Sequence, residues 1–138
     1  MILFVCTGNT CRSPMACALA RAGGVDAQSA GLHALPGAPA SPQAIRAASF
    51  YGADLTGHRA RTVDEALLGE AEAVWVMTEA HEAMLNMMFP QYSRKVSVLW
   101  PPIPDPYGGD ERTYEKCAKN LLEALRRAEI LPAAGNNF

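Results

Sequence analysis

Residues 2–14 set the architecture of the chain, and they are Ile2-Leu3-Phe4-Val5-Cys6-Thr7-Gly8-Asn9-Thr10-Cys11-Arg12-Ser13-Pro14. The first four form a short apolar run that predicts a buried strand, and the pattern of residues 15–21 predicts a helix. The residues between them therefore form a strand-to-helix loop, which is where an open α/β sheet places its binding crevice. Ser13 is predicted as the N-cap of the helix and Pro14 as its first residue.

This loop is predicted to bind an anion. Its backbone N–H groups and the N-terminus of the helix would face one concave spot, and both favour negative charge. The residues that we expect around a bound phosphate or similar oxyanion are Thr7, Gly8, Asn9, Thr10, Cys11 and Ser13.

Two side chains would make such a site reactive. Cys6 ends the predicted strand, so its sulfur can point into the loop, and the guanidinium of Arg12 can bind two oxygens of a phosphate. Surrounding N–H dipoles and a guanidinium favour the thiolate, which is the nucleophilic form of cysteine. One loop would then bind a phosphoryl group, supply the nucleophile and stabilise the transition state. The alternative for Cys6 is an ordinary buried thiol.

Strands and helices alternate along the rest of the chain. Further strands are predicted at residues 26–31, 73–78 and 95–99, and further helices at residues 42–51, 79–89 and 111–128. A short helix between them is expected to begin at Thr62, with Glu65 completing a capping box. The alternation predicts a single-domain α/β fold, a four-stranded parallel sheet flanked by helices on both faces and Rossmann-like in its winding. The domain would span residues 1–131, and residues 132–138 would be a flexible tail.

Composition narrows the class of protein. The chain has 138 residues, 49% of them apolar, which is enough for one globular domain. A net charge of −2 argues against binding nucleic acid, and no apolar run is long enough to span a membrane. The N-terminus lacks the basic segment of a signal peptide, so we expect a cytoplasmic protein. We also expect a monomer.

The cysteines suggest neither a disulfide framework nor a metal centre. The four are Cys6, Cys11, Cys17 and Cys117, and in a cytoplasmic protein they would be reduced. Cys6 and Cys11 could open a zinc site, but no second pair of cysteines or histidines follows them. We therefore expect no metal, and the absence of a glycine-rich nucleotide motif predicts no nucleotide cofactor.

A second chemical group lies near the C-terminus, in the sequence Asp105-Pro106-Tyr107. It follows the last predicted strand, so it should lie at the same edge of the sheet as Cys6. A carboxyl held there by neighbouring prolines could protonate the leaving group of a phosphoryl transfer. Alone, Asp105 would be an ordinary turn aspartate.

Taken together, these motifs resemble those of the low-molecular-weight protein tyrosine phosphatases. A cysteine, five residues and then Arg-Ser stand at the extreme N-terminus, and Asp-Pro-Tyr stands near the other end. The resemblance implies a phosphatase that acts on phosphorylated proteins through a phosphocysteine, without a cofactor. Cys6 would be the nucleophile, Arg12 would bind the phosphoryl oxygens, and Asp105 would be the general acid.

The same resemblance assigns supporting roles. Asn9 would hold the loop in a strained shape, with Ser41 and His58 as its hydrogen-bonding partners. Ser13 would assist formation and departure of the thiolate, and Tyr107 would form an aromatic wall at the entrance. The alternatives are a helix cap for Ser41 and a plain loop residue for His58.

Cys11 resembles a second cysteine that, in this family, can form a disulfide with the nucleophile under oxidation. That pairing would protect Cys6 from irreversible oxidation. A packing thiol is the other interpretation, and the sequence leaves both open.

Thr10 bears on which phosphorylated residue is cleaved. Tyrosine phosphatases of the family commonly have an aliphatic residue such as isoleucine at this position, whereas the loop Cys-Thr-Gly-Asn-Thr-Cys-Arg-Ser-Pro-Met resembles that of the protein arginine phosphatases. A threonine hydroxyl can hydrogen-bond a guanidinium or a water. The sequence therefore favours phosphoarginine, with phosphotyrosine as the alternative.

Three other functions compete with a phosphatase. Arsenate reductases share the loop but need two further cysteines in mid-chain, and residues 18–116 contain none. A phosphocysteine component of a sugar phosphotransferase does not need both Arg12 and Asp105. A phosphate-binding module without activity would not need Cys6.

Overall fold

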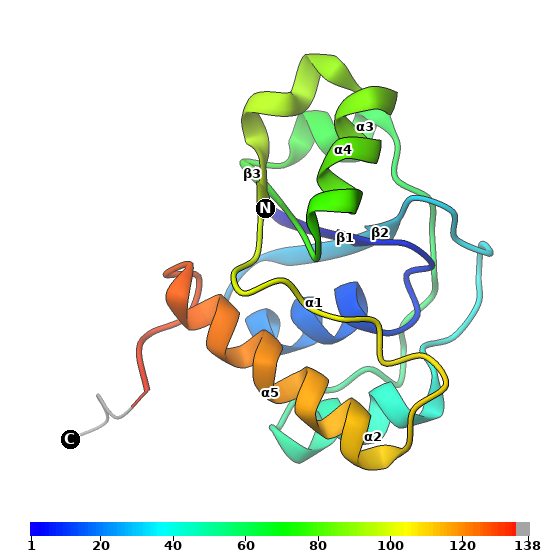
Figure 1. The fold of residues 1–138 in the computed structure, drawn as a ribbon, viewed down its shortest axis with the longest axis vertical. Helices are drawn as coiled ribbons and strands as arrows, with labels where there is room; N and C mark the ends of the chain where they lie inside the picture. The colour runs from blue at the N-terminus through cyan, green and yellow to red at the C-terminus, as the bar shows by residue number, and fades with distance from the viewer. Residues whose placement is uncertain (135–138) are drawn as a thin grey trace.

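A four-stranded parallel sheet forms the centre of the molecule. The structure, a computed structural model, describes residues 1–134. The strands are β1 (Ile2–Cys6), β2 (Ala27–Gly31), β3 (Ala73–Val76) and β4 (Val96–Val98), in the spatial order β2-β1-β3-β4. Because β1 lies between β2 and β3, the loop that follows it emerges at the middle of the sheet edge (Figure 1).

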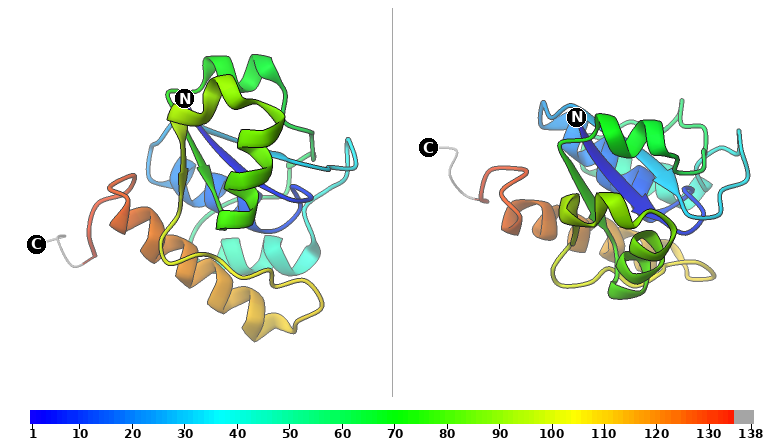
Figure 2. Two further views of the ribbon diagram at one scale, coloured as in Figure 1. Left: turned by 45° about the horizontal axis from the view of Figure 1, so that its top comes forward. Right: turned by 90° about the horizontal axis from the view of Figure 1, so that it is seen from above.

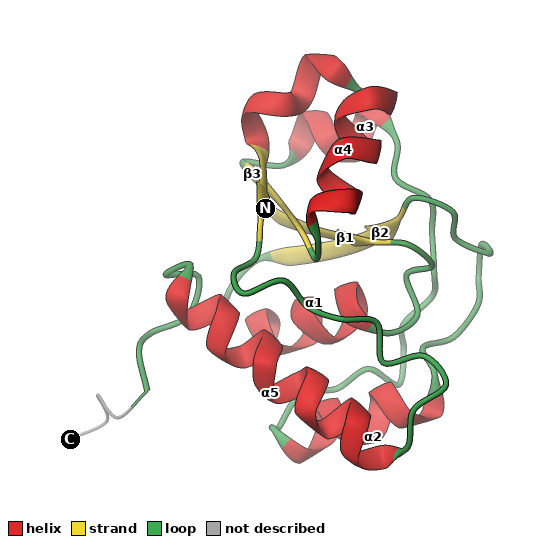
Figure 3. Cartoon of the chain, viewed as in Figure 1, coloured by secondary structure: helices red, strands yellow, loops and turns green. Residues whose placement is uncertain are grey.

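Helices cover both faces of this sheet. They are α1 (Arg12–Ala22), α2 (Pro42–Phe50), α3 (Glu65–Glu70), α4 (Glu79–Met88) and α5 (Glu111–Arg127), with a 3₁₀ helix, η1, at Pro90–Lys95. Helices α1, α2 and α5 lie on one side and α3 and α4 on the other, as the turned views and the colouring by secondary structure also show (Figures 2 and 3). The predicted fold class is confirmed.

The alternation of side chains along β1 divides the core into two parts. Phe4 and Cys6 pack with residues of α1, α2 and α5, whereas Leu3 and Val5 pack with residues of α3 and α4. All four are buried, as expected for a strand with helices on both faces. The pleat that buries Phe4 therefore also turns Cys6 toward α1, the helix that follows it in the chain.

Two helix starts differ from the prediction. Helix α1 begins at Arg12 with Cys11 as its N-cap, so Ser13 and Pro14 are its second and third residues. Proline is tolerated there because N–H groups of the first turn have no partner within the helix. The hydroxyl of Ser13 is therefore free to contact another side chain, as described below.

The capping box predicted at Thr62 is also wrong. Helix α3 begins at Glu65, and the carboxylate of its N-cap, Asp64, accepts a hydrogen bond from the backbone N–H of Leu67 at 2.9 Å. Thr62 instead forms an isolated parallel bridge with Gly31. A carboxylate at the N-cap also complements the helix dipole, which a threonine cannot do.

Other boundaries follow the sequence closely. The hydroxyl of Ser41 caps α2 by accepting from the N–H of Ala44 at 3.2 Å, and Pro42 is the first helical residue, as predicted. Pro90 follows α4 but begins η1, so the chain turns there. None of the helices in residues 1–134 has the length and hydropathy that crossing a bilayer requires. Most of the tail predicted for residues 132–138 lies outside the described residues.

Candidate active site

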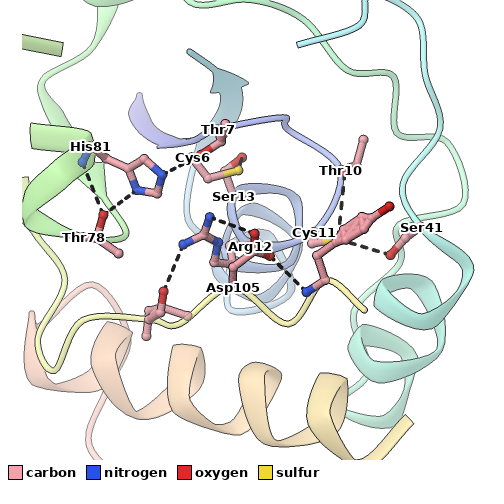
Figure 4. Close-up of polar contacts among 12 residues, drawn as sticks. Cys6, Thr7, Thr10, Cys11, Arg12, Ser13, Ser41, Thr78, His81 and Asp105 are labelled. Carbon is pink, nitrogen blue, oxygen red and sulfur yellow. Dashed lines mark hydrogen bonds and ion pairs between the residues drawn. The ribbon is translucent and has the colours of Figure 1, made fainter. Parts of the chain in front are cut away.

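The loop after β1 and the segment before α5 form one pocket of about 180 Å³. The residues that line it are Cys6, Thr7, Gly8, Thr10, Cys11, Arg12, Asp105 and Tyr107. The structure thus brings the predicted nucleophile, arginine and carboxyl together at the carboxyl edge of the sheet (Figure 4). We call residues 6–13 the Cys6 loop and residues 100–110 the Asp105 loop.

The sulfur of Cys6 rests on a hydroxyl. Its Sγ lies 3.0 Å from the Oγ of Ser13, and both residues are buried. The Ser13 hydroxyl can donate to the carbonyl of Ala30 at 3.3 Å or turn its single hydrogen to the sulfur. A thiolate is a stronger acceptor than a carbonyl, so an ionised Cys6 would draw this hydrogen away from Ala30.

Asn9 fixes the shape of the loop. Its φ of 58° lies in the left-handed region, which asparagine tolerates better than most residues. Its Nδ2 donates to Ser13 Oγ at 2.9 Å and to Ser29 Oγ at 3.0 Å, and its Oδ1 accepts from the N–H of Arg61 at 3.0 Å. The Nε2 of His58 lies 2.7 Å from the backbone carbonyl oxygen of Asn9. Burial lowers the pKa of His58, so a neutral ring donates to that carbonyl through Nε2.

Gly31, at the end of β2, lets the loop pack close to the sheet. A Cβ at this position would lie 2.6 Å from the carbonyl oxygen of Thr7 and 3.0 Å from the nitrogen of Asn9. Hydrogen bonds of 2.9 Å also join the N–H of Leu32 to the Cys6 carbonyl and that of His33 to the Thr7 carbonyl. The strand beside β1 therefore continues its pairing into the loop.

Ser41 supports the other end of the loop rather than Asn9. Its N–H donates to the carbonyl of Thr10 at 3.0 Å, and its Oγ lies 3.4 Å from the Sγ of Cys11. The hydroxyl of Tyr114, on α5, lies 3.7 Å from the same sulfur. Burial, together with the contact to Cys11, raises the pKa of Tyr114 to about 12, so it stays a neutral hydroxyl.

Arg12 joins the two loops. It is buried, and its Nη1 donates to the carbonyl of Ile103 at 3.1 Å. Its Nη2 lies 3.8 Å from Oδ2 of Asp105, whose side chain is 57% exposed. The N–H of Tyr107 donates to the other carboxylate oxygen at 3.0 Å. The guanidinium is thus anchored from behind, while the carboxyl lies at the open side of the pocket.

Sequence reasoning missed several residues that support the loop. Ser29 and Arg61 both bind the side chain of Asn9, and Tyr114 contacts Cys11. His81, on α4, lies 2.9 Å from the hydroxyl of Thr7 through its Nε2. These contacts join elements far apart in the chain. Only Ser29 could have been noticed in the sequence, because it is a polar residue within a buried strand.

Cys17 and Cys117 are buried thiols outside the pocket. All four cysteines of the chain are unpaired. Burial raises the pKa of the Cys117 thiol to about 12 and also raises that of Cys17. Within residues 1–134, no three His, Cys, Asp or Glu side chains gather as a metal ion would require. A disulfide between Cys6 and Cys11 stays a prediction.

Known proteins resemble this chain over nearly its whole length. Residues 1–130 match the model of the family described as low molecular weight phosphotyrosine protein phosphatase. A protein-arginine-phosphatase of Bacillus subtilis is 37% identical, covering 91% of this chain and 92% of the relative. A probable low molecular weight protein-tyrosine-phosphatase, EpsP of Ralstonia nicotianae, is 36% identical, covering 91% and 88%.

A solved structure extends the likeness to three dimensions. A mutant YwlE arginine phosphatase with a phosphorylated active site serine superposes with a TM-score of 0.87 at 34% identity. The match covers 92% of this chain and 91% of that one.

Proposed function

The chain belongs to the low molecular weight phosphotyrosine protein phosphatase family, and on that premise we propose that it hydrolyses phosphorylated protein side chains through a phosphocysteine, with phosphoarginine preferred. The observation that carries this proposal is the pocket in which Cys6, Arg12 and Asp105 converge. Together these three groups can carry out a two-step transfer without a metal or cofactor.

In the first step the thiolate of Cys6 attacks phosphorus. Arg12 and the N–H groups of the loop hold the phosphoryl oxygens and neutralise the charge that builds on them. The bond from phosphorus to the leaving nitrogen or oxygen breaks, and Asp105 gives its proton to that atom. The carboxyl suits this task because it lies at the open side of the pocket, where the leaving group must depart.

In the second step water attacks the phosphocysteine. Asp105, now ionised, takes a proton from the water, and the sulfur–phosphorus bond breaks. The Ser13 hydroxyl, 3.0 Å from the sulfur, donates to the departing thiolate. The phosphorylated serine in the related arginine phosphatase supports a covalent phosphoenzyme, because it carries the phosphoryl group on an active-site side chain.

The choice between phosphoarginine and phosphotyrosine rests on Thr10. The arginine and tyrosine phosphatases among the relatives are about equally similar to this chain, so overall identity does not separate them. Thr10 lines the pocket, and its backbone is held by Ser41. Its hydroxyl can then bind the guanidinium of phosphoarginine or the attacking water, which an isoleucine cannot do.

The test is competition between a phosphoarginine peptide and a phosphotyrosine peptide of the same sequence. We expect wild type to prefer phosphoarginine and Thr10→Ile to shift the ratio of the two kcat/KM values toward phosphotyrosine by about tenfold or more. Thr10→Ser keeps the hydroxyl and should keep the ratio, whereas Thr10→Val should behave like Thr10→Ile. A wild type that prefers phosphotyrosine, or a ratio that none of the variants changes, would contradict the arginine preference.

A further inference from the structure

His81 lies behind the Cys6 loop, and the two-step transfer gives it no role. It belongs to the first turn of α4, its side chain is buried, and its ring lies between two threonine hydroxyls (Figure 4). Nε2 lies 2.9 Å from Oγ1 of Thr7, and Nδ1 lies 3.1 Å from Oγ1 of Thr78. Thr7 is the residue next to the nucleophile, so the ring connects α4 to the centre of the site.

The partners of Thr78 favour one position for the hydrogen on this ring. Thr78 caps α4, and its Oγ1 accepts the backbone N–H of His81 at 3.3 Å. Its own hydroxyl hydrogen is satisfied if Nδ1 is the acceptor, which leaves the ring hydrogen on Nε2. Nε2 then donates to the hydroxyl oxygen of Thr7.

The surroundings of the His81 ring also favour its neutral form. Burial and the positive charge of Arg12 lower the pKa of His81 to about 4, while the carboxylate of Asp105 opposes this shift. A neutral imidazole has one donor and one acceptor, which fits the two threonine contacts. At neutral pH the ring therefore carries one hydrogen and no charge.

The consequence falls on Thr7. Its oxygen accepts from His81, so its own hydrogen is not used by that contact and can be donated elsewhere. Thr7 is exposed and lines the pocket, which makes a bound oxyanion the natural acceptor. With the opposite tautomer, Thr7 would donate to the ring and have no hydrogen left for the pocket.

We propose that His81 is a positioning residue that holds the Thr7 hydroxyl so that it donates to a phosphoryl oxygen in the pocket. Nothing in the family match assigns this role. The inference rests on the proposed function for its relevance to turnover, but the contact itself concerns the binding of phosphate. The effect of the contact on phosphate affinity can therefore be measured without turnover.

The experiment compares Thr7→Val, His81→Leu and the double variant by titration calorimetry with inorganic phosphate. Each single variant should bind phosphate about tenfold more weakly, since hydrogen bonds to charged groups are worth that much or more. The double variant should bind no more weakly than Thr7→Val alone, because both changes remove the same contact. His81→Gln, whose amide can still donate to Thr7, should recover most of the affinity.

Kinetics and controls separate positioning from a loss of structure. With p-nitrophenyl phosphate, KM should rise more than kcat falls, because the contact is made to bound substrate and transition state alike. Met87→Leu, which changes an exposed side chain of the same helix outside the pocket, is the control and should bind phosphate as wild type does. Thermal unfolding shows which variants are folded.

Unchanged phosphate affinity in folded Thr7→Val would overturn the inference, as would losses that multiply in the double variant. If His81→Leu does not fold, Thr7→Val and His81→Gln still decide the matter. A wild type that binds phosphate by this contact but cleaves no phosphorylated peptide would contradict the proposed function and leave the positioning role intact.

Discussion

The Cys6 loop and the Asp105 loop share one pocket, but they are held in different ways. Asn9 and Ser13 are fully buried, and hydrogen bonds join the Cys6 loop to Ser29 on β2, to Ser41 before α2 and to residues 58 and 61. In the Asp105 loop, the Asp105 side chain is 57% exposed and Tyr107 is 77% exposed. Its carboxylate is placed by the N–H of Tyr107 and by Arg12 at 3.8 Å.

This difference matches the two kinds of chemistry. Phosphoryl oxygens have the same geometry in every substrate, so their donors can be fixed in advance. Leaving groups differ in size and position, and a carboxyl on an exposed loop can adjust to them. Changes in the Cys6 loop should therefore affect all substrates, whereas changes in the Asp105 loop should depend on the leaving group.

The strongest test of the fixed loop is Cys6→Ser. We expect turnover of p-nitrophenyl phosphate to fall to about a thousandth of wild type or less, because an alcohol in this site is a far weaker nucleophile. Phosphate binding, measured by calorimetry, should survive, since Arg12 and the loop N–H groups remain. Substantial turnover by Cys6→Ser would refute the covalent step.

The test of the exposed loop is Asp105→Ala. With an unactivated leaving group such as phosphotyrosine, we expect the rate of phosphoenzyme formation to fall about a hundredfold, the usual contribution of a general acid. With p-nitrophenyl phosphate, whose leaving group needs little protonation, the loss should be smaller. Rapid-quench kinetics on both esters measures the difference. Equal losses would show that Asp105 is not the acid, and Asp110→Ala, the cap of α5, is a control in the same region.

Oxidation tests how rigid the Cys6 loop is. Cys11 is held beside Ser41 and Tyr114, so a disulfide with Cys6 requires its sulfur to leave these contacts. If it does, peroxide should inactivate the protein reversibly, and most activity should return with dithiothreitol. Mass spectrometry should find a peptide linked through Cys6 and Cys11, and Cys11→Ser should lose activity permanently. Permanent loss in wild type would mean that Cys11 only packs.

The smallest expected effect concerns stability and pH. The pKa of His81 is about 4 in the folded chain and near its usual 6.5 when unfolded, so between these values the unfolded state binds more protons. The free energy of unfolding should therefore fall as the pH is lowered through this range, by roughly 3 kcal/mol from this residue. His81→Gln should show a shallower fall in denaturant titrations at several pH values. Parallel curves for the two proteins would show that His81 does not titrate as described.

The positions of the proposed catalytic groups were predictable because each stands next to a backbone pattern. Cys6 ends an apolar run, and Asp105 follows the last strand, so the parallel sheet itself places them at one edge. The start of α1 was not predictable by capping rules, because the loop already turns into helix at Arg12. Ser13 does not cap the helix as the capping rules predicted, but it contacts the sulfur of Cys6, as the family resemblance implied.

The contacts that support the loop could not be predicted, since they depend on how distant segments meet. His81 and Thr7 are 74 positions apart, and Arg61 and Asn9 are 52 apart. Periodicity places elements but does not give the register between a loop and a helix on another layer. The resemblance correctly placed His58 at Asn9 but not Ser41, which supports Thr10 and Cys11 instead.

Gly31 contributes to this site because it has no side chain. The space that its absent side chain leaves is filled by the backbone at Thr7 and Asn9. A saturation mutagenesis screen should find this position as intolerant as the nucleophile, although it offers no reactive group and is separated from Cys6 by the whole of α1. Anyone who transplants residues 6–13 onto another α/β scaffold would have to carry this glycine along, on a strand that the transplanted segment does not include.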